Sequence, residues 1–184
     1  MKYSPNFRFT ILVSESCALA QSLPYRLPCG FPAQIKSVPA GQIRAQMAER
    51  PIDGLILSAD ELNTAQELAE HSYTAVLILA GEGAPGVVES CARSGVMVCT
   101  ADSLSAVLPS FLACCARLRS LCTETASLKR KLDDTWIVTR AKLLLMSRLK
   151  MSENEAHRYI EKTAMDTGAK RREVAESIIR TYEE

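Results

Sequence analysis

The sequence predicts an α/β domain built on a doubly wound parallel sheet, then a long helix and a small three-helix module. Apolar runs alternate with amphipathic segments from Phe9 to Thr100, the order that gives βα units with right-handed crossovers. A leucine-rich helical pattern and three shorter helical patterns follow. We therefore expect an α/β domain at 1–108, a coiled-coil linker helix at 109–135 and a helical module at 136–184.

Five apolar runs have the length of strands, and Pro or Gly marks most joints between them. Three runs, TILV, GLIL and AVLILA, are apolar on consecutive residues, as expected for strands covered on both faces. The connection after the first strand has the weakest helical pattern, because Pro24, Pro28 and Pro32 crowd it. The expected strands are Phe9–Val13, Ala33–Val38, Gly54–Leu57, Ala75–Ala80 and Val96–Thr100, and the expected helices are Ile43–Glu49, Glu61–Ser72 and Val87–Ser94.

A long helix is predicted from Ser103 onward, and Pro109 in its first turns could kink it or mark a second start. Apolar side chains along it follow alternating steps of three and four, which is the heptad pattern of a coiled coil. We expect a parallel homodimer, while a helix that folds back on its own domain would show a similar stripe. The stripe comprises Phe111, Cys114, Leu118, Leu121, Thr125, Leu128 and Leu132, of which Leu118, Leu121, Leu128 and Leu132 are the predicted dimer seam.

Three helices are expected after the linker, the first over Trp136–Leu149. Ser152 and Glu155 have the spacing of a capping box that opens the second helix. Gly168 can take the left-handed conformation that ends it. The predicted inner faces are Ile137, Ala141, Leu144 and Leu145 on the first helix, Ala156, Tyr159, Ile160, Thr163 and Ala164 on the second, and Val174, Ala175, Ile178 and Ile179 on the third.

Four short motifs in this C-terminal segment resemble a known family. They are AKLLLM from Ala141 to Met146, S-x-x-E-A from Ser152 to Ala156, Ala164–Met165 and Val174–Ala175. This pattern resembles the ANTAR domain, the RNA-binding module of AmiR/NasR-type transcription antiterminators. Leu143 stands where the family often has Gly, a change that a helix accepts. The resemblance implies binding to paired hairpins in nascent leader RNA.

The five βα units resemble the receiver domain of response regulators, a flavodoxin-like fold that often precedes an ANTAR module. Receiver chemistry needs an acidic pair, a phosphoacceptor Asp, a hydroxyl residue and a Lys at the strand ends. The chain instead has a single Glu15, Ser58 at the acceptor position, Ala80 without a hydroxyl, and Asp102 about where Lys is expected. A serine cannot form the acyl phosphate, so we expect a pseudo-receiver, with Asp60 as a less favoured slipped acceptor.

Basic side chains on the three C-terminal helices are the candidates for RNA contact, because they can neutralise phosphates. A solvated charged face is the alternative for each of them. Lys170, Arg171 and Arg172 form the densest cluster, and Trp136 and Tyr159 could stack on bases but fall on or near apolar faces. The candidates are Arg140, Lys142, Arg148, Lys150, His157, Arg158, Lys162, Lys170, Arg171 and Arg172.

Composition agrees with a regulator and gives no support for an enzyme. The segment from Lys129 onward carries a net charge of +3 and the preceding residues −2, for a total of +1. The sequence has no Ser/His/Asp or Cys/His arrangement, metal-ligand cluster or nucleotide-binding loop, so no cofactor or metal is expected. Seven cysteines without a C-x-x-C spacing indicate reduced, mostly buried thiols in a cytoplasmic protein.

Control by a partner is the expectation that follows from a pseudo-receiver. Family members without a phosphoacceptor are held inactive by a ligand-sensing protein that resembles periplasmic binding proteins, and the resemblance implies such a partner here. The alternative function is a DNA-binding response regulator with a helix-turn-helix output. The segment between the second and third C-terminal helices sets up no evident recognition helix, so antitermination is favoured.

Overall fold

The computed structural model describes residues 9–23, 33–81 and 85–183, which form two compact units. The first unit is Met1–Cys122 and the second is Thr123–Glu184. The boundary between the two units lies inside the long helix. It falls after residue 108, where the α/β domain was expected to end, and before residue 135, where the linker helix was expected to end.

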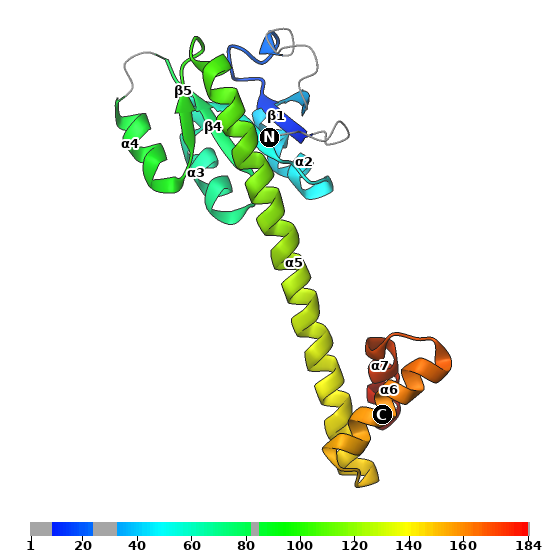
Figure 1. Cartoon of the computed structure of the whole chain (residues 1–184). Coiled ribbons are helices and arrows are strands. Elements are labelled where there is room, and N and C mark those ends of the chain that lie inside the picture. The colour runs from blue at the N-terminus through cyan, green and yellow to red at the C-terminus, as the bar shows by residue number, and fades with distance from the viewer. Residues whose placement is uncertain (1–8, 24–32, 82–84, 184) are drawn as a thin grey trace. The chain divides into compact units, whose positions relative to one another are not determined.

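A five-stranded, all-parallel sheet forms the centre of the first unit (Figure 1). Its order is β2-β1-β3-β4-β5, so the chain winds to one side from β1 and then to the other from β3. The doubly wound sheet predicted from the apolar runs is confirmed. The strands are β1 Phe9–Ser14, β2 Ala33–Val38, β3 Gly54–Ser58, β4 Ala75–Leu79 and β5 Met97–Cys99.

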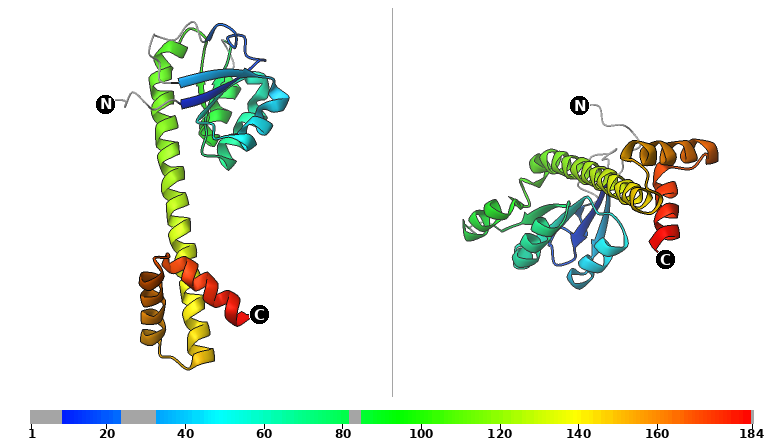
Figure 2. Two further views of the ribbon diagram at one scale, coloured as in Figure 1. Left: turned by 90° about the vertical axis from the view of Figure 1, so that its right-hand side faces the viewer. Right: turned by 90° about the horizontal axis from the view of Figure 1, so that it is seen from below.

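Helices α2 (Ile43–Glu49), α3 (Leu62–His71) and α4 (Pro85–Ser94) cover one face of the sheet, and α5 covers the other (Figure 2). The three predicted helices agree with these spans within two residues at each end. Single 3-10 turns, η1 (Ala40–Gln42) and η2 (Ala59–Glu61), precede α2 and α3. Turns occupy 15–22 after β1, and Pro24, Pro28 and Pro32 lie outside the described residues.

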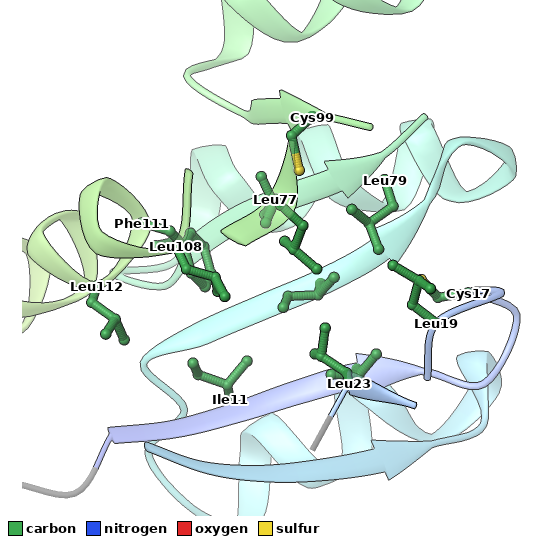
Figure 3. Close-up of a cluster of buried hydrophobic side chains, with 14 of the residues drawn as sticks. Ile11, Cys17, Leu19, Leu23, Leu77, Leu79, Cys99, Leu108, Phe111 and Leu112 are labelled. Carbon is green, nitrogen blue, oxygen red and sulfur yellow. The ribbon is translucent and has the colours of Figure 1, made fainter. Parts of the chain in front are cut away.

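The α5 face of the sheet is sealed by Leu108, Phe111, Leu112 and Cys115, which pack among strand side chains such as Ile11 and Leu77 (Figure 3). The strand can approach α5 closely because residue 54 is Gly: a Cβ there would lie 2.8 Å from the ring carbon Cζ of Phe111. An ion pair holds the helix at the neighbouring position. Arg119 lies 2.5 Å from the buried carboxylate of Asp53, which also accepts the Thr10 N–H at 2.7 Å.

Helix α5 runs unbroken from Leu104 to Leu149, so Pro109 marks no second start. The helix predicted at Trp136–Leu149 is therefore the end of this element. Lys150 follows with a φ of +56°, a left-handed conformation that breaks the helical path. Within the described residues, α5 is the one helix long and apolar enough to span a bilayer. The first part of α5 packs against the sheet through Leu108, Phe111, Leu112 and Cys115.

The heptad pattern of α5 divides into two parts. Phe111 and Leu118 pack against the sheet, as the fold-back alternative proposed. Beyond them, large apolar side chains are exposed, from 40% at Leu121 to 70% at Leu132. They follow helical steps of four and seven along one face, and we call them the apolar stripe. The apolar stripe consists of Leu121, Leu128, Leu132, Trp136 and Leu143.

The second unit packs the end of α5 against α6 (Glu153–Thr167) and α7 (Arg171–Glu183). The predicted capping box is confirmed, since the Ser152 hydroxyl accepts the Glu155 N–H at 3.3 Å and Glu155 Oε2 accepts the Ser152 N–H at 2.8 Å. That hydrogen bond from the backbone lowers the pKa of Glu155. Gly168, with a φ of +66°, ends α6 as expected.

Small alanines allow the three helices of the second unit to approach closely. Ala141, Ala156 and Ala175 are fully buried, and Leu145 and Ile160 fill the space between them. These positions belong to the inner faces predicted from the sequence. Tyr159 was also predicted on an inner face, and this prediction is wrong: the side chain is 44% exposed because it lies beside the buried stripe of α6.

The cysteines described by the structure are free thiols, as predicted. Burial raises the pKa of Cys99 to about 11 and that of Cys115 to about 12, so these thiols stay protonated near neutral pH. Cys122 is exposed, and Cys29 lies outside the described residues.

Candidate nucleic-acid interface

A groove of about 960 Å³ lies within the second unit, between the end of α5, helix α6 and the start of α7. Its walls carry five lysine or arginine side chains, one histidine and one carboxylate, that of Asp134. We call it the basic groove. Its basic residues are Arg130, Lys142, His157, Lys170, Arg171 and Arg172.

Half of the sequence candidates for RNA contact meet in the basic groove. The other half lie outside its lining, and one of them, Arg140, places its guanidinium 5.4 Å from the centre of the exposed Trp136 ring. Arg130 was not among the candidates, because it lies in the expected linker helix before the module that begins at residue 136. The candidates outside the lining are Arg140, Arg148, Lys150, Arg158 and Lys162.

The cluster at the start of α7 is largely paired with acidic side chains. Arg172 donates to Asp134 at 2.6 Å and to Glu176 at 2.8 Å, and these hydrogen bonds raise the pKa of Arg172. Arg171 donates to Glu161 at 3.2 Å. These pairs are solvent-exposed, so a polyanion can compete for the guanidinium groups at little cost. Among the described residues, Lys170 has no ion-pair partner for its ammonium group.

The entrance of α6 is tied to α5 through Lys142. Its ammonium group lies 2.8 Å from Glu153 Oε1, and this hydrogen bond lowers the pKa of Glu153. His157 lies 3.5 Å from Glu161 Oε1, a pair that carries charge attraction only when the imidazole is protonated. The acids Asp134, Glu153 and Glu161 thus hold the cations of the basic groove in a defined arrangement. RNA phosphates could replace these carboxylates as the partners of the same cations.

At the carboxyl edge of the sheet in the first unit, the described residues form a capping network at the expected acceptor position. Ser58, at the expected acceptor position, heads the turn η2, and its N–H donates to Glu61 Oε2 at 2.9 Å. The buried Ser14 hydroxyl donates to Glu61 Oε1 at 2.8 Å. A capping network therefore occupies this edge, while Glu15 and Asp60 are exposed. Ala80 is buried where a hydroxyl residue would contact a phosphoryl group.

A receiver-like sheet joined through α5 to a three-helix basic module defines a class of regulators. Residues 126–179 match the ANTAR domain family, a span that holds α6, most of α7 and the whole basic groove. The chain thus carries an ANTAR domain behind a receiver-like domain, the organisation of ANTAR-type transcription antitermination regulators.

Two curated relatives are similar to this chain over most of its length. Both are called transcriptional regulatory protein PdtaR, from Mycobacterium tuberculosis strains CDC 1551 / Oshkosh and ATCC 25618 / H37Rv. Each is 26% identical to this chain over 152 residues, covering 77% of this chain and 74% of the relative.

Proposed function

We propose that this protein is a cytoplasmic antiterminator that binds paired hairpins in nascent leader RNA through its ANTAR domain. The observation that carries the proposal is the convergence of Lys142, His157 and Lys170–Arg172 on one groove inside the residues that match the family. A hairpin held in this groove could not pair into the stem of a terminator. Elongation would then continue into the operon.

RNA recognition would combine phosphate contacts made by cations with contacts between aromatic rings and unpaired loop bases. Cations of the basic groove supply phosphate contacts, which give affinity and salt dependence without reading sequence. Sequence-specific RNA recognition relies on unpaired bases that splay out of loops and stack on aromatic rings. Tyr159 is exposed on α6, and Trp136 is exposed on α5, so these two aromatic rings of the module are accessible.

Two hairpins suit a protein with two modules, and a homodimer would supply them. The apolar stripe is the surface for the second copy in this proposal, because four of its five members are more than half exposed. The opposite face of α5 in the second unit, with Ala141 and Leu145, is already buried against α6 and α7.

Control would come from protein–protein sequestration instead of phosphorylation. The Ser14–Glu61–Ser58 network uses the sheet edge for capping, and no second carboxylate accompanies Glu15 to hold Mg²⁺. A ligand-sensing protein resembling periplasmic binding proteins is the proposed negative regulator. Release from that partner would free the ANTAR domain for RNA.

Replacing Lys170, Arg171 and Arg172 by Ala is expected to weaken binding to an RNA carrying two adjacent hairpins. The slope of log affinity against log salt should fall by up to about two to three charges. Filter binding at several salt concentrations measures both effects, and circular dichroism should show the helices intact because the three side chains are exposed or half-exposed. The matched control removes three exposed cations of the first unit, Arg50, Arg93 and Arg117, and should leave the slope unchanged. Equal slopes for the wild type and the 170–172 variant would remove the basic groove from the proposal.

Incubation with acetyl phosphate and Mg²⁺ is expected to add no phosphoryl group to the protein. Ser58 cannot form an acyl phosphate, and Asp60 is exposed outside the capping network. Intact-mass spectrometry measures the result. A stable mass gain that disappears on changing Asp60 or Asp53 to Asn would contradict control by sequestration alone.

A further inference from the structure

We propose that the pocket between α6 and α7 receives one unpaired RNA base bearing an exocyclic amino group. This inference rests on the proposed RNA binding and deepens it by naming a base-reading site. The pocket has a volume of about 350 Å³, within the ~300–1,000 Å³ of small-molecule sites. Its residues all belong to the second unit, and we call it the base pocket.

Two tyrosines give the base pocket its aromatic walls. Tyr159 enters from α6 and is 44% exposed, and Tyr182 enters from the last turns of α7. Tyr182 packs against the module core, so its ring is held from behind, while Tyr159 is accessible from solvent. A planar base can stack on such a ring, whatever its identity, because every base has a π face.

Hydrogen-bonding groups in the base pocket favour a partner that donates. Glu173 uses Oε2 to accept the Lys170 N–H at 3.1 Å, which caps α7, and its Oε1 has no partner among the described residues. The hydroxyls of Thr167 and Thr181 each donate to a carbonyl of their own helix, at 2.7 and 2.9 Å, and keep their lone pairs for an incoming donor. Carboxylates accept from the exocyclic amino groups of bases. Adenine, cytosine and guanine carry such a group and uracil does not.

The base pocket adjoins the basic groove, since Ala169 lines both. Lys170, next in the chain, lies in the basic groove and its ammonium group has no ion-pair partner among the described residues. A nucleotide with its phosphate near Lys170 can therefore turn its base toward Tyr159 without crossing the module. Arg158 and Lys162 flank Tyr159 along α6 and add positive charge on the other side.

The test begins with selection of RNAs by the full-length wild-type protein from a pool of adjacent hairpins with randomised loops. Each unpaired loop base of a selected RNA is then changed to uracil. One base is expected to matter through the base pocket: Tyr159→Ala should weaken binding about 5- to 150-fold, the range for loss of one stacked base. In that variant, the uracil change at this base should have no further effect.

Three further variants separate stacking, donor recognition and folding. Tyr159→Phe keeps the ring and should bind as the wild type does. Glu173→Gln keeps an acceptor for the cap of α7 but adds an amide donor, so the uracil penalty should shrink. Tyr73→Ala is the matched control, because Tyr73 is 48% exposed in the first unit.

The outcomes distinguish this inference from the proposed function. Failure of the wild type to enrich any RNA would overturn RNA binding and the base pocket together. Enriched RNAs that bind Tyr159→Ala as tightly as the wild type would overturn the base pocket alone. The base pocket would also be overturned if Tyr159→Ala weakens binding by the same factor for every loop change and the uracil penalty in Glu173→Gln equals that of the wild type.

Discussion

Replacing Leu128 and Leu132 by Glu is expected to convert a dimer into monomers at micromolar concentration. The two side chains are 64% and 70% exposed in the single chain, so a second copy would bury most of their surface. Each fully buried Leu contributes about 1.5–3 kcal/mol. Two per chain in a symmetric pair give at least about 6 kcal/mol, or roughly four orders of magnitude in the dissociation constant.

Sedimentation velocity over a concentration series measures this change. The matched control is Ala126→Glu with Ser127→Glu, two exposed positions on the faces of α5 away from the apolar stripe. It should leave the dimer intact and the RNA affinity unchanged. The Leu128/Leu132 variant should bind a paired-hairpin RNA more weakly, because each monomer offers one module. A wild-type protein that sediments as a monomer at micromolar concentration would contradict the assignment of the apolar stripe to a second copy.

Replacing Phe111 by Ala is expected to lower the free energy of unfolding of the first unit by about 3–5 kcal/mol. The ring is fully buried, and Gly54 of β3 leaves room for it against the sheet. Removal of the ring leaves a cavity between α5 and β3 that neither rigid element can close. Urea denaturation followed by circular dichroism measures the effect, with the module transition treated separately because two units need not unfold together.

Val88→Ala is the control for the Phe111 substitution. Val88 is 55% exposed on α4, so its truncation should change the free energy of unfolding by no more than about 0.5 kcal/mol. A Phe111→Ala variant that unfolds at the same urea concentration as this control would show that the ring does not hold α5 on the sheet.

The sheet could be predicted because three of its strands are apolar on consecutive residues, and Pro or Gly marks most joints between the runs. The continuity of α5 could not be predicted, because Thr135 and Thr139 interrupt the leucine pattern. The structure shows that the helix continues through both residues. The helix ends at Ser152, Glu155 and Gly168 could be predicted, because capping depends on residues three or fewer positions apart in the sequence.

The candidate site was less predictable, because its geometry depends on contacts between distant residues. Arg172 meets Asp134 across 38 positions of sequence, and no local pattern indicates that pairing. Tyr159 has the spacing of a core residue on α6, but it lies at the margin of the buried stripe and faces solvent. The positive charges in the sequence indicated five of the six basic residues of the basic groove, without Arg130, and did not show which of them lie together.

The most direct measurement of the central claim compares two ligands of the same sequence in one binding assay. The first is a leader RNA that folds into two adjacent hairpins, and the second is the duplex DNA that encodes it. We expect the full-length protein to bind the RNA at least tenfold more tightly at physiological salt, because unpaired loop bases are absent from the duplex. Equal affinity for the two would contradict the antitermination account and favour a DNA-binding regulator.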